Sequence, residues 1–265
     1  MYLRDRDLQA VARLWHELAE FPAARADAAR EHCLTALVQI LGATNAFWVG
    51  TTRTVPVVAD DPLHGWRPRA DQTLHRDEAR DRLIRQLLRQ MERQVVDPHT
   101  AAIAARAGTT RAFLRPELVP DDEWRQSWLA SEMFPTLGIS DRMVGANAVH
   151  PSAESYIGLD RGPGDKPFSR RERDLLYAFL LGSSPFHREQ LQVHRLIGPS
   201  LTPREREVLH LLLTDLTERQ IADRLGLTPR TTHQYVVSVL KKLGVSGRIG
   251  LMALWLRRAP ASEQG

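Results

Sequence analysis

The chain has 265 residues, of which 43% are hydrophobic and 26% are charged. Because it has no apolar run of about 18 residues and begins with the charged stretch MYLRDRDLQA, we expect a soluble, cytoplasmic protein with no membrane partner. The single cysteine, Cys33, has no partner for an internal disulfide, which excludes a disulfide-stapled secreted domain. We expect Cys33 in the core.

The net charge is divided unevenly along the chain. Residues 1–198 contain 26 Lys/Arg and 26 Asp/Glu, whereas residues 199–265 contain 10 and 6, so the whole formal charge of +4 belongs to the C-terminal part. A basic module is typical of a protein with a phosphate-bearing partner, although a module that binds other proteins can have the same charge. The length suits one large domain and one small domain.

Apolar spacing predicts the elements of the larger part in chain order. The predicted helices are 3–19, 26–41, 78–95, 121–133 and 170–181, and the predicted strands are 45–51, 110–118, 142–151 and 154–160. Pro56, Pro62, Gly65 and Pro68 break residues 53–75 into short strands or loop. We therefore expect an α+β domain in which helices flank an antiparallel sheet.

The end of this part resembles a known sensory domain. The segment SYIGLDRGPGDKPFSRRERDLLYAFL is similar to the last strands and exit helix of a GAF domain. The resemblance implies a GAF/PAS-like sensory domain over residues 1–181. A helical stretch at 186–197 lies between Ser-Ser-Pro and Gly-Pro-Ser, so we expect a helical linker at 182–198 and a second domain at 199–265.

Three helix starts in the second domain share one chemistry. Thr202 and Thr217 each precede a Glu or Gln by three residues, which predicts capping boxes, and Thr228 is followed by Pro229 at the first helical position. Gly226 ends the second helix only two residues before Thr228. A helix, a tight turn and a helix are the geometry of a helix-turn-helix.

The third helix of this domain has one apolar face and one polar face. Thr232, Val236, Val239 and Leu243 share the apolar face, with Tyr235 and Leu240 at its edges. The opposite face consists of Arg230, Gln234, Val237 and Lys241, flanked by His233 and Ser238. Glu263 is the only acid after Thr228, so this face can approach phosphates and offer donors and acceptors to base edges in a major groove.

These motifs resemble the LuxR/GerE-type DNA-binding domain. The similar segment is LTPREREVLHLLL...LTERQIADRLGLTPRTTHQYVVSVLKKLGVSGRIGLMALW, which departs from the family pattern at Thr232, usually valine, and Tyr235, often histidine. The resemblance implies a four-helix domain that binds double-stranded DNA, with base reading by His233, Gln234 and Val237. The implied contacts, including those to the DNA backbone, are Arg219, Gln220, Arg230, Thr231, His233, Gln234, Val237, Ser238, Lys241 and Lys242. It also implies a dimer-forming last helix with Leu251, Met252, Leu254 and Trp255, and an inverted-repeat operator.

Other interpretations stay open for this domain. Lys242 is equally consistent with a solvated lysine, and Val237 with a scaffold residue at the edge of the helix. A helical bundle with a basic surface also suits a protein-interaction module that does not bind DNA.

The larger part contains no motif for catalysis or phosphorylation. Walker A, GxSxG, HExxH and CxxC are absent, so we expect no enzyme, no cofactor and no metal. TVPVVADD imitates the first strand of a phospho-receiver, but Pro56 interrupts it and a predicted helix occupies the place of the phosphoacceptor strand. His150, His187 and His194 are scattered and expected in loops or on the surface.

Aromatic residues suggest a ligand pocket in the larger part. The candidates are Trp48, Trp66, Trp124, Trp128 and Tyr156. The alternative is that these side chains are ordinary core or a dimer surface. An acyl-homoserine-lactone pocket, as in quorum-sensing relatives, is a third possibility suggested by Asp61-Pro62. Together these features predict a one-component bacterial transcription regulator that responds to an unidentified small molecule or partner and binds DNA as a homodimer.

Overall fold

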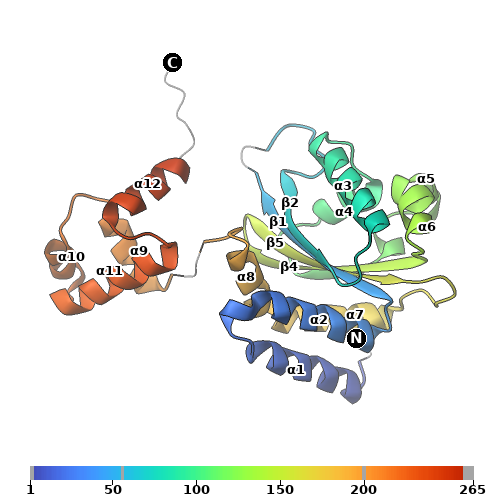
Figure 1. Cartoon of the computed structure of the whole chain (residues 1–265), viewed down its shortest axis with the longest axis horizontal. Helices are drawn as coiled ribbons and strands as arrows, with labels where there is room; N and C mark the ends of the chain where they lie inside the picture. Colours follow the sequence, from blue (N-terminus) through green and yellow to red (C-terminus); the bar gives the residue numbers. More distant parts are fainter. Residues whose placement is uncertain (1–2, 55–56, 199–200, 259–265) are drawn as a thin grey trace. The chain divides into compact units, whose positions relative to one another are not determined.

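A computed structural model gives the structure of residues 3–54, 57–198 and 201–258, with side chains described up to residue 253. The chain forms two compact units, Met1–Ile197 and Gly198–Gly265 (Figure 1). Among the described residues, no helix has both the length and the hydropathy needed to cross a membrane.

The first unit is built on a five-stranded sheet with the order β2-β1-β5-β4-β3, in which every neighbouring pair is antiparallel. The strands are β1 (Asn45–Arg53), β2 (Trp66–Thr73), β3 (Arg111–Leu114), β4 (Asp141–His150) and β5 (Ala153–Arg161). The predicted antiparallel sheet flanked by helices is therefore confirmed. A phospho-receiver is excluded, because its sheet is parallel.

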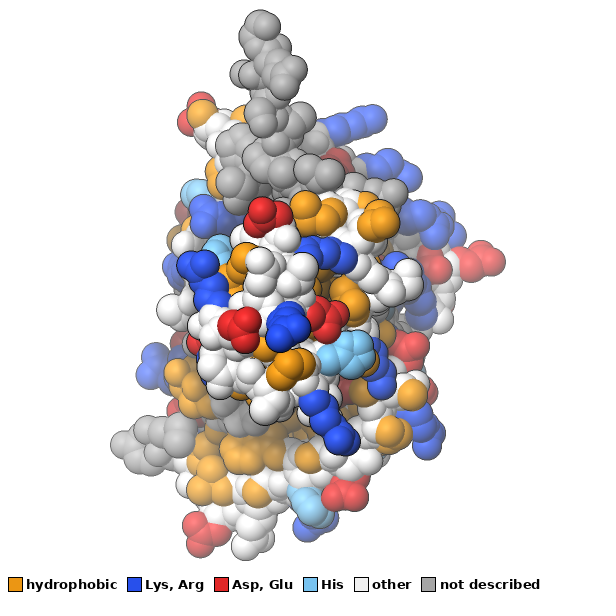
Figure 2. Space-filling model, turned by 90° about the vertical axis from the view of Figure 1, so that its left-hand side faces the viewer, with side chains coloured by type: hydrophobic (Ala, Val, Ile, Leu, Met, Phe, Trp, Pro, Cys, Tyr) orange, Lys and Arg blue, Asp and Glu red, His pale blue; other side chains and the backbone are white. Residues whose placement is uncertain are grey.

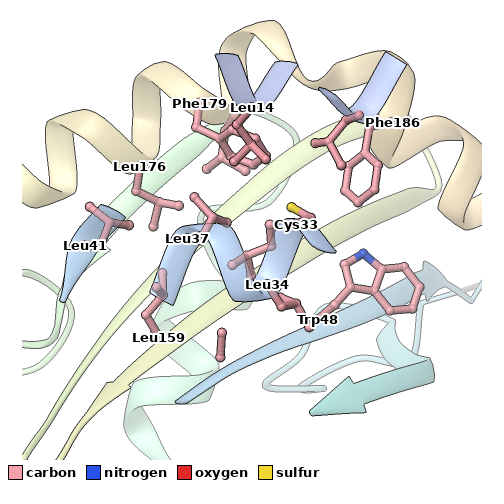
Figure 3. Close-up of a cluster of buried hydrophobic side chains, with 14 of the residues drawn as sticks. Leu14, Cys33, Leu34, Leu37, Leu41, Trp48, Leu159, Leu176, Phe179 and Phe186 are labelled. Carbon is pink, nitrogen blue, oxygen red and sulfur yellow. The ribbon is translucent and has the colours of Figure 1, made fainter. Parts of the chain in front are cut away.

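Helices pack on one face of this sheet and enclose the main core (Figure 1). These helices are α1 (Asp5–Ala19), α2 (Ala26–Leu41), which follows the short turn η1 (Ala23–Arg25), α7 (Arg170–Gly182) and α8 (Ser184–Val193). Figure 3 shows Cys33, Leu34 and Leu37 of α2 in the layer between Phe179 of α7 on one side and Trp48 of β1 and Leu159 of β5 on the other. Cys33 is fully buried, as predicted. Helix α8 also belongs to this core, so the segment expected as a linker contributes to the packing of the first unit.

Shorter elements cover the other face of the sheet. They are α3 (Glu78–Glu92), α4 (Pro98–Ala104), η2 (Arg115–Glu117), α5 (Asp121–Gln126), the π-helical turn η3 (Leu129–Met133) and α6 (Phe134–Thr136). These elements form two small hydrophobic clusters of their own and, together with the sheet, enclose a cavity.

Two helices predicted for this face were wrong in detail. Helix α3 ends at Glu92, before the predicted end at Val95. Gln94 adopts a positive φ of 60°, which a right-handed helix does not contain, and the Val95 side chain is 61% exposed. Asp97 instead begins α4, where its Oδ1 accepts a hydrogen bond from the His99 amide at 3.0 Å. The helix predicted at 121–133 breaks at Ser127, whose ψ of 152° is extended and whose Oγ accepts from the Ala130 amide.

Strand β2 forms even though Pro68 lies within it. Pro68 pairs with Thr51 at a position where the register of β1 and β2 shifts, between Gly50 and Thr51. Because β2 is an edge strand, the missing amide of Pro68 costs less there than it would in the centre of the sheet. The sequence rule that proline interrupts a strand fails here for this reason.

The second unit is helical in its described part. Its helices are α9 (Pro203–Leu212), α10 (Glu218–Leu225), α11 (Pro229–Leu243) and α12 (Arg248–Arg258). Their apolar faces form one cluster that includes Val208, Ile221, Val236, Val239 and Leu251. This cluster is separate from the core of the first unit.

Candidate DNA-binding surface and ligand cavity

The start of α11 is fixed by its cap, as the sequence predicted. Thr228 Oγ1 accepts from the Thr231 amide at 3.1 Å, and Pro229 occupies the first turn. Gly226 ends α10 with a φ of 64°, in the left-handed region that glycine adopts without strain. Thr202 and Thr217 form the predicted capping boxes of α9 and α10. The local sequence therefore determines where α10 ends and α11 begins.

Helix α11 has the two faces that the sequence predicted. Thr232, Val236 and Val239 are buried against α9 and α10. The exposed residues of the other face are Arg230, His233, Gln234, Val237 and Lys241. Val237 is 49% exposed. The exposed face is therefore polar and basic with one apolar position.

Two predicted DNA-contact residues share the buried carboxylate of Glu205. Ser238 Oγ donates to Glu205 Oε1 at 2.7 Å, and Lys242 Nζ lies 2.6 Å from Glu205 Oε2. Glu205 is 4% exposed, and the hydrogen bond from Lys242 lowers the pKa of its carboxyl group to about 2. This Glu205 cluster joins α9 to α11. The sequence predicted Glu205 only as a capping residue. Its contact with α11 could not be predicted, because it depends on Ser238, which is 33 residues away in the chain.

Thr232 has a buried hydroxyl group without a partner. The residue is fully buried, and its Oγ1 has no hydrogen-bond partner among the described residues. The sequence suggested that this hydroxyl could bond a carbonyl one turn back, and the structure does not show that bond. Valine, which the family usually has at this position, would fit the buried site without leaving a hydroxyl group unpaired.

The remaining predicted contacts lie on exposed parts of α10 and α11. Arg219 and Gln220 are exposed. Gln220 Oε1 also accepts a hydrogen bond from the Thr217 amide within the capping box. The His233 ring lies 3.0 Å from Glu218 Oε2. Figure 2 shows Lys and Arg side chains spread over the drawn face with Asp and Glu side chains between them. The basic character is thus distributed and does not form one uniform patch in this view.

The last helix contains the residues predicted to form a dimer. Leu251 is fully buried in the core of its own unit, so its predicted place on a dimer surface was wrong. Met252 is 41% exposed. Leu254 and Trp255 belong to α12, but their side chains lie outside the described residues.

A cavity of about 180 Å³ lies between the sheet and the elements α3, α4 and η3. Trp66 and Tyr156, two of the five predicted pocket residues, line it. Trp48 also borders it, but its indole ring packs on the opposite face of the sheet, where Nε1 donates to Ser155 Oγ at 2.6 Å. Trp124 and Trp128 are absent from the lining and pack in a separate cluster with Phe134. The predicted set is therefore divided among three places.

Charged groups that were not predicted from the sequence lie on this side of the sheet. Arg142 and Asp160 face each other across β4 and β5, and Arg80 of α3 reaches the same carboxylate. Arg111 pairs with the fully buried Glu154 on the same face. Glu154 and Asp160 are an even number of positions apart on β5, so they share one face of the sheet, and this spacing is a signal that could have indicated the inward-facing pairs.

Two histidines are buried, which corrects the expectation for one of them. His187, expected in a loop or on the surface, is fully buried, and burial lowers its pKa to about 3. Its Nδ1 lies 2.8 Å from Ser155 Oγ. His99 is 2% exposed and lines the cavity, and its pKa is lowered to about 3 by burial and by the nearby cations Arg142 and Arg115. Both imidazoles are therefore neutral at physiological pH.

Asp61 has a structural role in the loop before β2. Its carboxylate accepts from the Leu63 and Gly65 amides at 3.1 and 2.6 Å and pairs with Arg67 at 3.1 Å. These contacts lower the pKa of Asp61 against the effect of burial. Asp61 does not line the cavity, so the lactone pocket suggested by Asp61-Pro62 lacks that residue.

Comparison with known proteins identifies the second unit. The model for bacterial regulatory proteins of the luxR family matches residues 199–254. The spore germination protein GerE of Bacillus subtilis is 44% identical over 50 residues, which cover 19% of this chain and 68% of GerE. The chain belongs to the luxR family. The transcriptional regulatory protein UhpA of Escherichia coli is 41% identical over 51 residues, which cover 19% of this chain but only 26% of UhpA.

A solved structure resembles nearly the whole chain in fold. SdiA in complex with octanoyl-rac-glycerol aligns with a TM-score of 0.50 and 17% identity, over 96% of this luxR-family chain and 95% of SdiA. At this identity the likeness concerns the fold alone. The helical C-terminal unit and the α+β N-terminal unit are thus found together in a known protein.

Proposed function

We propose that this protein is a one-component bacterial transcription regulator of the cytoplasm, in which residues 199–265 bind promoter DNA. The observation that supports this most strongly is the exposed face of α11. Arg230, Gln234 and Lys241 lie there on a helix that is fixed by a cap at its start and by a buried face behind it. Such a helix can enter a major groove, where a glutamine can read a base edge and arginine and lysine can contact the flanking phosphates.

The roles of the individual contacts follow from their environment. We assign base reading to His233, Gln234 and Val237, and backbone contacts to Arg219, Gln220, Arg230, Thr231 and Lys241. For Ser238 and Lys242 the Glu205 cluster supports a different role, in which they hold α11 on α9. This fixed position lets the exposed face meet DNA without reorganisation.

The first unit is proposed as a sensory domain, in which residues 1–181 form the main body and residues 182–198, which add α8 to its core, also make the connection to the second unit. Its cavity is bordered mainly by apolar side chains and by a few polar ones, which is the usual composition of a small-molecule site. The sheet with helices on both faces supports the GAF/PAS-like description. The proposed activity needs no catalytic residue.

The protein is proposed to bind DNA as a homodimer through α12. A dimer would read an inverted repeat with two copies of α11. Met252, exposed on α12, supports this surface. Sedimentation of the full chain with and without its DNA site measures the stoichiometry, and one chain per site would reject the dimer.

A salt titration tests DNA binding directly. We expect the affinity of the full chain for genomic promoter fragments, measured by fluorescence anisotropy, to fall steeply with salt because bound phosphates release counterions. Absent or salt-insensitive binding would instead favour a protein-interaction module with a basic helical surface.

Substitutions on α11 separate base reading from phosphate contact. We expect Gln234→Ala to reduce the preference for the cognate site over random duplex, by about 1–3 kcal/mol for a bidentate contact. Lys241→Ala should weaken binding to both duplexes by a similar factor and should lower the slope of the salt dependence by about one. Arg85→Ala, an exposed position on α3 of the first unit, is the matched control and should change neither quantity. Equal effects of Gln234→Ala on both duplexes would contradict the assignment.

A further inference from the structure

The cavity of the first unit has two buried guanidinium groups that share one carboxylate. Arg142 Nε and Nη2 lie 2.6 and 3.0 Å from the two oxygens of Asp160, and Arg80 Nη1 lies 3.3 Å from Asp160 Oδ2. The exposed fractions of Arg80, Arg142 and Asp160 are 7%, 6% and 1%. Both arginines line the cavity.

The charges of this cluster do not balance. In the part of the chain that the structure describes, Asp160 is the only carboxylate within ion-pair distance of Arg80 or Arg142. Asp71 also borders the cavity, but it is exposed and pairs with Arg76. The cluster therefore has one excess positive charge in a buried place, and such a charge is unfavourable unless an anion compensates it.

Polar atoms of the cavity wall are left without partners. Arg80 Nε and His99 Nε2 are buried and have no hydrogen-bond partner among the described residues. His99 is neutral, as its lowered pKa indicates, so its ring can donate one hydrogen bond. Buried donors of this kind are normally satisfied, which points to an acceptor that a ligand supplies.

The rest of the cavity is suited to a small apolar group. Its apolar wall includes Leu63, Ile84, Leu87, Leu88, Met91 and Met133. Its volume of about 180 Å³ is close to that of cavities of about 150 Å³ that hold one benzene molecule. A ligand that fills it has an apolar part of about six carbons.

We propose that this cavity binds a small monocarboxylate with an apolar body of about six carbons, whose carboxylate pairs with Arg80 and Arg142 next to His99. The proposal deepens the sensory role proposed above and rests on it. A neutral ligand of the same shape would fill the apolar part and leave the excess charge uncompensated. The carboxylate is therefore the group that the site selects.

Matched ligands test this proposal on the unaltered full chain. Hexanoate and benzoate are compared with their neutral isosteres hexanamide and benzamide by isothermal titration calorimetry, at one pH and one ionic strength. We expect at least one carboxylate to bind about tenfold or more tightly than its amide, because its hydrogen bonds are charge-assisted. Equal or tighter binding of the amides, or no binding of either class, overturns the proposal.

A substitution tests the assigned cation. Arg80→Gln should remove most of the preference for carboxylate over amide, whereas Arg85→Gln, at an exposed position of the same helix, should keep it. Arg142 retains its bidentate pair with Asp160 in the Arg80→Gln variant, so we expect the fold to persist. An unchanged preference in a folded Arg80→Gln variant overturns the assignment, and if this variant does not fold, the ligand comparison decides alone.

Two measurements on the same protein sample distinguish a failure of this proposal from a failure of the proposed regulator function. The salt titration of DNA binding is carried out alongside the calorimetry. Amide binding without carboxylate preference, together with salt-dependent DNA binding, overturns the carboxylate proposal and leaves the regulator in place. Carboxylate preference without DNA binding supports the ligand assignment and rejects the regulator.

Discussion

At the scale of single residues, the second unit contains one polar group that opposes its own stability. Thr232 places a hydroxyl in the core, where Oγ1 has no partner among the described residues. A buried hydroxyl without a hydrogen bond costs about 1–3 kcal/mol. Valine has nearly the same shape and lacks this cost.

We therefore expect Thr232→Val to raise the free energy of unfolding of the second unit by about 1 kcal/mol. The measurement is the urea midpoint of the backbone amide NMR signals of α11 in the full chain. Thr231→Val is the matched control, because the Thr231 hydroxyl is bonded to Thr228 Oγ1 at 2.8 Å and its loss should give no gain. A lower midpoint for Thr232→Val would show that the hydroxyl has a partner in solution.

Glu205 makes the second unit sensitive to acid. Its pKa is lowered from 4.5 to about 2, chiefly by the hydrogen bond from Lys242. The folded state thus binds a proton less readily than the unfolded state, so the stabilisation is present above pH 4.5 and is lost as the pH falls toward 2.

We expect the urea midpoint of α11 to fall over this acid range in the wild type and to depend less on pH in Glu205→Gln. Glu207→Gln is the control, because Glu207 lies on the same helix and pairs with Arg204 on the surface. Parallel pH profiles for the wild type and Glu205→Gln would show that Glu205 is not the responsible group.

At the scale of elements, Asp97 organises two segments at once. Its Oδ1 caps α4, and its Oδ2 accepts from the Leu129 amide at 3.1 Å, at the start of η3. Both segments border the cavity through His99 and Leu129. One side chain therefore sets the position of a large part of the cavity wall.

Asp97→Ala should destabilise these segments by about 1–2 kcal/mol, the usual cost of a lost cap. We expect faster hydrogen exchange at residues 98–104 and 129–133, measured by mass spectrometry of the full chain. Asp122→Ala removes an exposed acid from the first turn of α5 and should leave this exchange unchanged. Unchanged exchange in Asp97→Ala would mean that packing alone holds the two segments.

The sequence predicted those elements whose cause is local. The caps of α9, α10 and α11, the faces of α11 and the antiparallel strands β4 and β5 follow from spacing over a few residues. The cluster of Arg80 and Asp160 joins positions 80 residues apart, and only the sheet register and the path of α3 bring them together. The aromatic candidates were predicted to share one cavity, and spacing along the chain alone could not separate them, because the face on which a side chain lies depends on the strand and cluster it joins.

At the scale of the whole molecule, each unit has its own hydrophobic core. The first core contains Leu34, which is 1% exposed, and the second contains Val239, which is fully buried. The basic charge of the chain belongs to the second unit, and the charged cavity cluster to the first. The proposed tasks of sensing and DNA binding therefore depend on different sets of packed residues.

A core substitution in the first unit tests this division. Leu34→Ala should lower the free energy of unfolding of the first unit by about 2–5 kcal/mol, because it leaves a cavity in a packed core. We expect the urea midpoint of α11 to stay unchanged in the same sample. Leu8→Ala, at a position 46% exposed on α1, is the control. A shift of both midpoints by Leu34→Ala would show that the two cores unfold together.

The edges of the sheet affect how copies of this protein can associate. Strand β2, at one edge, contains Pro68 next to a register shift, and β3, at the other edge, extends only from Arg111 to Leu114. A proline without an amide and a very short strand both make poor templates for an incoming strand. Both edges of the sheet therefore discourage the addition of strands from other molecules at high concentration.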